Sequence, residues 1–140
     1  MKILLAVDGS DYTKRMLAFL ATHEEMLGKA DSFTALTVVP AIPPRAQSFL
    51  DPLVVDEYCR SESERVLEPV RRFAAQKGWP LETEHRVGHA GDAIAEVADS
   101  GRYDLVVMGS HGHSALAGAV LGSVTTRVLA RCKTPLLILH

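Results

Sequence analysis

Cysteine is scarce in this sequence: Cys59 and Cys132 are the only two among 140 residues. They form neither a C-x-x-C pair nor the spacing of a zinc site, so we expect no disulfide framework and a reducing compartment. Basic blocks are missing as well, because 15 Lys and Arg residues are scattered among 17 Asp and Glu residues. With a net charge of -2, neither nucleic acid nor a membrane surface is expected as a partner.

Long hydrophobic runs are also missing. The longest, such as "ILLAV" and "LLIL", are far too short to cross a bilayer. The apolar run after Lys2 ends at Asp8, which is shorter than the hydrophobic region of a signal peptide. We therefore expect a cytoplasmic protein. With 47% hydrophobic and 23% charged residues, the sequence predicts one globular domain over residues 1–140.

Five short apolar runs recur along the chain, with helical patterns between them. Four are apolar almost throughout, as is typical of strands buried on both faces of a parallel sheet: residues 2–7, 32–39, 104–109 and 135–139. The run 81–87 alternates apolar and polar residues, which predicts a half-exposed strand near an edge. Repeated alternation of strands and helices predicts an α/β fold with a mainly parallel sheet.

The helical patterns carry three further expectations. Pro69 lies inside the second pattern and predicts a kink or a break into two helices, because proline lacks an amide hydrogen. Asp92 is expected to cap the next, short helix. The final helix, residues 124–132, is expected to present Val124, Val128 and Leu129 on its apolar face.

The glycine-rich stretch "GSHGHSALAGAVLGS", residues 109–123, joins the fourth predicted strand to the last helix. Ligands of open parallel sheets lie beyond the carboxyl ends of the strands, which places this loop beside Asp8. A helix N-terminus stabilises an anion, and Gly122, Ser123 and Ser114 offer close approach and donors. A ligand-free surface loop is an equally compatible reading. Neither G-x4-G-K-S/T nor G-x-G-x-x-G is present to decide between the two.

A resemblance to a known family favours the interpretation that the glycine-rich loop binds a ligand. The stretch "VVMGSHGHSALAGAVLGSVTTRVL" resembles the nucleotide-binding signature of the universal stress protein family, G-x2-G-x9-G-S/T, here Gly109, Gly112, Gly122 and Ser123. The opening "ILLAVDGS" and the ending "KTPLLILH" are similar to the family's first and last strands. The resemblance implies an adenine-nucleotide α-hydrolase-like α/β fold: a single open five-stranded parallel sheet in the order 3-2-1-4-5, with helices on both faces.

The resemblance also implies a ligand, ATP or else ADP or AMP, accompanied by Mg²⁺. Gly122, Ser123 and Val124 would hold the phosphates at the helix N-terminus. Asp8 would lie near the ribose or, with Ser123, near the Mg²⁺, and Val38 would meet the adenine through its backbone. The expected nucleotide-binding residues are Ala6, Asp8, Val38, Met108, Gly109, His111, Gly112, His113, Ser114, Gly122, Ser123 and Val124.

The resemblance has one departure. Many relatives carry a basic side chain in the loop, whereas "GHSALAGAV" has none, so AMP or ADP becomes an alternative to ATP. No base or arginine finger is evident, so we assign no catalytic residue and expect any ATP hydrolysis to be slow. The leading hypothesis is an ATP-binding regulatory protein of a stress response. The alternatives are a nucleotide hydrolase or transferase using His111 or His113, and a nucleotide-free dimerising adaptor.

Three other groups of residues are interpreted without a catalytic or ligand-binding role. Ser110 and His111 are adjacent and are not expected to point at each other, which argues against a hydrolytic triad with Asp8. The charged run "RSESERVLEPVRR" is read as a solvated helix face, and Arg127 and Arg131 as surface residues. The last strand, Pro135–Leu139, would be an edge that relatives pair across a two-fold axis, so a homodimer is expected.

Overall fold

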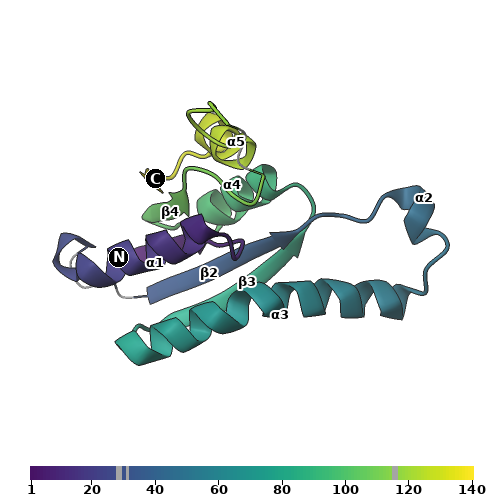
Figure 1. Cartoon of the computed structure of the whole chain (residues 1–140), viewed down its shortest axis with the longest axis horizontal. Helices are drawn as coiled ribbons and strands as arrows, with labels where there is room; N and C mark the ends of the chain where they lie inside the picture. The colour runs from purple at the N-terminus through teal and green to yellow at the C-terminus, as the bar shows by residue number, and fades with distance from the viewer. Residues whose placement is uncertain (28–29, 31, 115–116) are drawn as a thin grey trace.

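A sheet of parallel strands runs through the computed structural model (Figure 1), which describes residues 1–27, 30, 32–114 and 117–140. The strands are β1 (Lys2–Ala6), β2 (Ser32–Val39), β3 (Leu81–Val87), β4 (Leu105–Gly109) and β5 (Leu136–Leu139). Their order is β3-β2-β1-β4-β5, with every neighbouring pair parallel. This confirms the fold class and the order 3-2-1-4-5, and each strand lies within one residue of its predicted limits.

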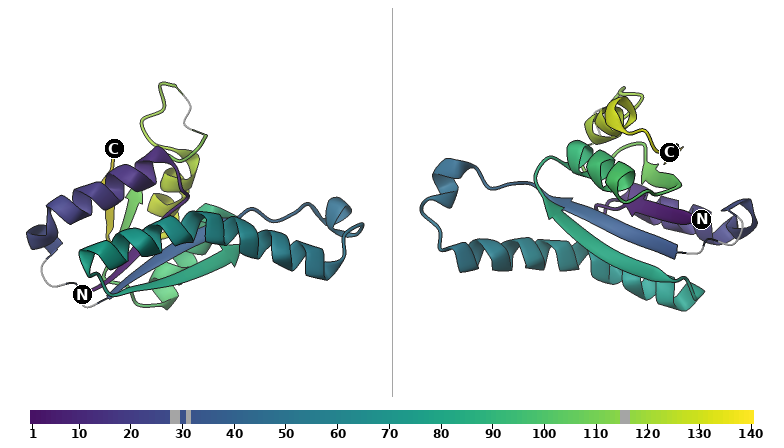
Figure 2. Two further views of the ribbon diagram at one scale, coloured as in Figure 1. Left: turned by 60° about the horizontal axis from the view of Figure 1, so that its bottom comes forward. Right: turned by 180° about the vertical axis from the view of Figure 1, so that it is seen from behind.

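Helices cover both faces of the sheet, which explains why the strands are apolar almost throughout (Figure 2). Ile3 and Leu5 of β1 belong to one core cluster, whereas Leu4 between them belongs to the other, and all three are fully buried. The first cluster includes residues of α1 (Asp11–Thr22) and α3 (Pro52–Lys77). The second includes residues of α4 (Ala90–Ser100) and α5 (Ser123–Arg131). Successive residues of a strand point to opposite faces of the sheet, so each strand contributes side chains to both hydrophobic cores.

The edge strand β3 is half exposed, as its alternating pattern predicts. Its burial is intermediate at Leu81 and Thr83, and Val87 at its end is 51% exposed. The other edge, β5, is of intermediate burial along its whole length. Within the described residues, no helix is long and apolar enough to cross a membrane.

Helix α3 runs unbroken from Pro52 to Lys77 through Pro69, so the predicted break into two helices is wrong. It follows the short helix α2 (Pro44–Gln47), and the two extend beyond the end of the sheet in Figure 1. Leu67 and Val70, on either side of the proline, are both 2% exposed and pack into the core. Burial on both sides of the interrupted turn stabilises the helix where local propensity would end it.

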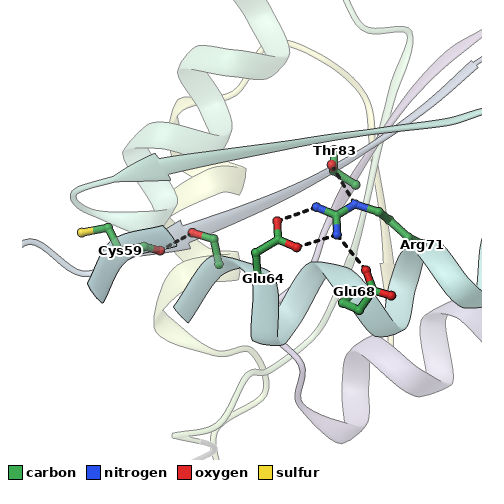
Figure 3. Close-up of polar contacts among 6 residues, drawn as sticks. Cys59, Glu64, Glu68, Arg71 and Thr83 are labelled. Carbon is green, nitrogen blue, oxygen red and sulfur yellow. Dashed lines mark hydrogen bonds and ion pairs between the residues drawn. The ribbon is translucent and has the colours of Figure 1, made fainter. Parts of the chain in front are cut away.

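Ion pairs on α3 also bridge the turn that contains the proline (Figure 3). The guanidinium of Arg71 donates two hydrogen bonds to Glu64, at 2.6 and 2.7 Å, and one to Glu68 at 3.0 Å. Its Nε also donates to Thr83 Oγ1 of β3 at 3.3 Å. The hydrogen bonds from Arg71 lower the pKa of Glu64. Arg71 therefore links both sides of the proline to the neighbouring strand.

The start of α4 differs from the prediction. The residue that caps this helix is His89, and Asp92 lies within its first turn, so the expected cap at Asp92 is wrong. The Asp92 carboxylate instead accepts hydrogen bonds from Arg127 Nε at 2.8 Å and from Arg131 Nη1 at 2.6 Å. These pairs join α4 to α5. On α5, Val128 is fully buried as expected, whereas Leu129 is 54% exposed, so its predicted place in the core is wrong.

The pairing of Asp92 predicts a stability change in acid. Hydrogen bonds from Arg127 and Arg131 lower the pKa of Asp92 from 3.8 to about 2. A depressed carboxyl pKa contributes stability that is present above the unfolded-state pKa and is lost as the pH falls through the folded-state pKa. We expect Asp92→Asn to be less stable than wild type at pH 6, and the difference to shrink between pH 4 and pH 2. Urea unfolding at several pH values measures this, and a pH-independent difference would contradict it.

Candidate functional site

A cavity of about 320 Å³ opens at the carboxyl ends of β1, β2 and β4. One wall of the cavity is formed by residues at or just past the ends of these three strands. The loop between β4 and α5 forms the opposite wall. The cavity lies where the strand order reverses. From β1 the chain proceeds through β2 to the edge strand β3, and it then returns to the other side of β1 to form β4 and the second edge strand, β5. Open parallel sheets bind ligands at such a switch point.

Every residue that the family resemblance nominated lines this cavity. They come from three strand ends, the glycine-rich loop and the first turn of α5. The set is Ala6, Asp8, Val38, Met108, Gly109, His111, Gly112, His113, Ser114, Gly122, Ser123 and Val124. Residues more than 100 positions apart in the chain therefore share one concave surface of a size suited to a small ligand.

Asp8 is fixed at the cavity by its own backbone turn. Its Oδ1 accepts hydrogen bonds from the Ser10 amide at 2.9 Å and from Thr13 Oγ1 at 3.0 Å, and Thr13 Oγ1 in turn accepts from the Asp8 amide at 3.1 Å. Its Oδ2 lies so close to Gly112 that a Cβ atom there would collide with it. Only glycine lets the loop pass over this carboxylate. The sequence analysis missed Thr13, whose hydroxyl holds Asp8 in place.

Two histidines fasten the glycine-rich loop. His113 Nε2 lies 2.7 Å from the Asp8 carbonyl oxygen, and His111 Nε2 lies 3.0 Å from the Ala119 carbonyl oxygen. A carbonyl only accepts, so both ring nitrogens donate. The first bond joins the loop to the end of β1, and the second closes the loop on itself. Both histidines therefore act first as structural donors.

The expectation that Ser110 and His111 would not face each other is wrong. Ser110 Oγ lies 3.0 Å from His111 Nδ1 and 3.0 Å from His140 Nδ1. However, the partner behind His111 is a backbone carbonyl rather than a carboxylate, and Ser110 is only 2% exposed. The contact is thus a buried polar link between the loop and the end of β5, made by a serine that is not among the residues lining the cavity. A hydrolytic triad is not assembled here.

Two glycines of the loop, Gly109 and Gly122, lie at close approaches to neighbouring atoms. A Cβ atom on Gly109 would lie 2.6 Å from the Cβ of Tyr12, and one on Gly122 would lie 3.1 Å from the Cα of His111. Gly122 is also the N-cap of α5 and makes no side-chain cap. The first amides of α5 have no partner within the helix, and Ser123 to Thr125 line the cavity. These donors and the helix dipole favour an anion.

Thr125 holds the first turn of α5 in place and was missed by the sequence analysis. Its Oγ1 lies 2.9 Å from the Gly109 carbonyl oxygen and 3.2 Å from that of Ser110, and the residue is 2% exposed. A threonine in the first turn of a helix after a glycine-rich loop was the available signal.

Helix α3 supplies a wall of the cavity that the sequence analysis also missed. Tyr58, Glu62, Arg65 and Val66 all line it. The charged run that includes Arg65 was read as a solvated face; Arg65 is 70% exposed, and it also lines the cavity, which that reading did not include. The spacing i, i+4, i+7 of Tyr58, Glu62 and Arg65 places them on one helix face. A cation is therefore present at the cavity, contributed by α3 rather than by the loop.

Metal-binding groups are limited. Asp8 and Ser123, nominated for a nucleotide-bound Mg²⁺, both line the cavity. Over residues 1–27, 30, 32–114 and 117–140, no group of three or more His, Cys, Asp and Glu residues is placed to hold a metal ion. A resident metal with purely protein ligands thus has no support in this part of the chain. A cation carried by ligand phosphates and one carboxylate is compatible with it.

An open parallel sheet with a ligand-sized cavity at its switch point defines the class as a doubly wound α/β protein with a site at the strand ends. The sequence model described as "Universal stress protein family" matches residues 1–140. The chain therefore belongs to the universal stress protein family.

Curated relatives agree with this assignment. A universal stress protein of Thermus aquaticus is 34% identical over 140 residues, covering 99% of this chain and 97% of the relative. One of a Synechocystis strain is 33% identical over 136 residues, covering 97% of this chain but only 41% of the relative. The chain thus spans less than half the length of the Synechocystis relative and nearly all of the Thermus one.

Solved structures share the fold. The protein MJ0577 superposes with a TM-score of 0.83 at 22% identity, covering 99% of this chain and 94% of that one. A universal stress protein in complex with cAMP (TM-score 0.65, 27% identity) covers 100% and 96%. An Archaeoglobus fulgidus universal stress protein in complex with dAMP (TM-score 0.69, 20% identity) covers 100% and 98%.

Proposed function

We propose that this protein binds an adenine nucleotide in the cavity at the ends of β1, β2 and β4. In this proposal it acts as a nucleotide-dependent regulatory protein of a stress response. The observation that carries the proposal is the meeting of the whole signature set, from Ala6 to Val124, on one cavity that includes the uncapped N-terminus of α5. The cAMP and dAMP complexes of structural neighbours support an adenine nucleotide as the ligand.

Each part of the cavity has a role in this proposal. The backbone of Val38 at the end of β2 meets the adenine, and the Asp8 carboxylate binds a ribose hydroxyl or the Mg²⁺ that accompanies a polyphosphate. The amides of Gly122, Ser123 and Val124 bind the phosphate, since donors at a helix N-terminus are aimed at an anion. Mg²⁺, when bound, would neutralise phosphate charge. Asp8 and Ser123 are the protein residues that would face it.

The proposal includes binding and no dedicated catalysis. Both loop histidines, His111 and His113, donate Nε2–H to carbonyl groups, so we assign neither a catalytic role. Phosphoryl transfer also needs a residue that orients the nucleophile, and we assign that role to none of the residues lining the cavity. We therefore propose that ATP, if it is the ligand, is hydrolysed slowly. A homodimer paired through β5 and a cytoplasmic location remain part of this proposal.

One purification tests the proposal. The protein is purified without added nucleotide and denatured, and the released small molecules are identified by mass spectrometry. The emptied protein is then titrated with AMP, ADP and Mg²⁺-ATP by calorimetry. We expect one adenine nucleotide per chain, released or bound. A protein that releases none and binds none would overturn the proposal and favour the nucleotide-free adaptor. Turnover that depends on His111 would favour an enzyme.

A further inference from the structure

Arg65 is the one full cation among the described residues that line the cavity. The other charged groups of this surface are the carboxylates of Asp8 and Glu62, so its acidic residues outnumber its one arginine. A phosphate entering such a cavity is repelled unless a cation reaches it. The amides of α5 provide partial positive charge only.

The position of Arg65 is set by packing of α3 against the β1–α1 loop. The next residue, Val66, lies against Gly9, where a Cβ atom would be 3.6 Å from Val66 Cγ2. Leu67, one residue further on, is 2% exposed in the core. These contacts fix the helix beside Asp8, so that Arg65 faces the same cavity as the start of α5.

The present partner of Arg65 is easily exchanged. Arg65 Nη2 lies 2.9 Å from Glu62 Oε2, and the two side chains are 70% and 35% exposed. Ion pairs between exposed side chains contribute little to stability. A phosphate also presents two acceptor oxygens to the guanidinium and carries more charge, and arginine binds it through two parallel N–H groups.

We propose that Arg65 responds to the phosphate charge of the ligand. When a nucleotide binds, the Arg65 guanidinium leaves Glu62 and pairs with the phosphate, so that Glu62 and the phosphate compete for Arg65. This inference rests on the proposed function and extends it, because it assigns the preference among nucleotides to a residue outside the signature. Affinity for adenosine then does not depend on Arg65, whereas affinity for nucleotides depends on it increasingly with the number of phosphates.

Matched variants on α3 test this inference. Arg65→Gln removes the cation, and Glu62→Gln removes its competitor. Arg60→Gln is the control, because Arg60 pairs with Glu57 at the same i, i+3 spacing and similar exposure but does not line the cavity. Binding of adenosine, AMP and ATP to each variant is measured by calorimetry at two salt concentrations, and the melting temperature reports on folding.

We expect Arg65→Gln to weaken ATP binding about tenfold and AMP binding about threefold, with adenosine unchanged, the loss for ATP being smaller at high salt. Glu62→Gln should strengthen ATP binding about threefold, and Arg60→Gln should change none of the three. Equal affinities for Arg65→Gln and Arg60→Gln, or an equal loss for adenosine and ATP, would overturn the inference alone. A wild-type protein that binds no adenine compound would overturn the proposed function itself.

Discussion

Gly122→Val is expected to weaken adenine-nucleotide binding by about 30-fold or more, equivalent to about 2 kcal/mol. A Cβ atom at this position would lie 3.1 Å from the Cα of His111 and 3.2 Å from the carbonyl oxygen of Ser110. Both contacts are with backbone, so the branched side chain must push the loop away from the start of α5. The amides that bind the phosphate in our proposal would then no longer converge. Calorimetric titration of the emptied protein measures the effect.

A second variant separates this effect from misfolding. Ser123 is the first residue of α5, and Gly122 before it has φ −69° and ψ 162°, a conformation that suits the residue preceding a proline. Proline is well tolerated at the first helical position. Ser123→Pro therefore keeps the helix but removes one amide donor and one hydroxyl, and we expect binding to weaken about tenfold with little change in melting temperature. Unchanged binding by both variants would place the nucleotide elsewhere.

Gly109→Ala is expected to lower the free energy of unfolding by about 1–3 kcal/mol, as overpacking of a full interior does. The new Cβ would lie 2.6 Å from the Cβ of Tyr12 and 3.1 Å from the carbonyl oxygen of His111. Neither atom is the end of a flexible side chain, so α1 or the loop must shift. A fall in melting temperature of about 4–10 °C is the corresponding thermal change.

The control for this prediction is Gly118→Asn. Gly118 has a φ of 85°, no atom lies within 4 Å of its Cβ position, and asparagine adopts this left-handed conformation more readily than other side chains. We expect this variant to lose less than about 1 kcal/mol of stability, which is the cost of a side chain at positive φ with no steric clash. If Gly109→Ala is as stable as Gly118→Asn, the close approach of α1 to the loop is not a constraint on the sequence.

The strands and the loop could be predicted from the sequence because their signals are local. β1 is apolar at consecutive positions because Ile3, Leu4 and Leu5 are buried on both faces, and β3 carries polar residues because none of its residues is fully buried. The strand order, in contrast, could not be predicted from local signals. Local patterns indicated a parallel sheet, and the order 3-2-1-4-5 came only through resemblance to a family, because pairing between distant strands leaves no local trace.

The helices show where local rules fail. Pro69 carries a strong breaking signal, yet α3 continues through it because Leu67 and Val70 are buried on both sides of the interrupted turn. Asp92 has the chemistry of a cap, yet its carboxylate pairs with Arg127 and Arg131, 35 and 39 residues away. Tertiary partners outweighed local preference in both cases, since each local preference is worth only a small part of the folding free energy.

The sequence by itself determined the fold class, the strand limits and the loop with its nominated residues, because burial and turn chemistry act on neighbours in the chain. Only the tertiary structure decided that those residues share one cavity with Thr13, Thr125 and a wall from α3. It also decided that Ser110 and His111 face each other and that Arg65 faces the site. These contacts depend on which elements pack together and in what register. A charged helix face has the same sequence pattern whether it contacts water or a ligand, so the sequence does not distinguish the two.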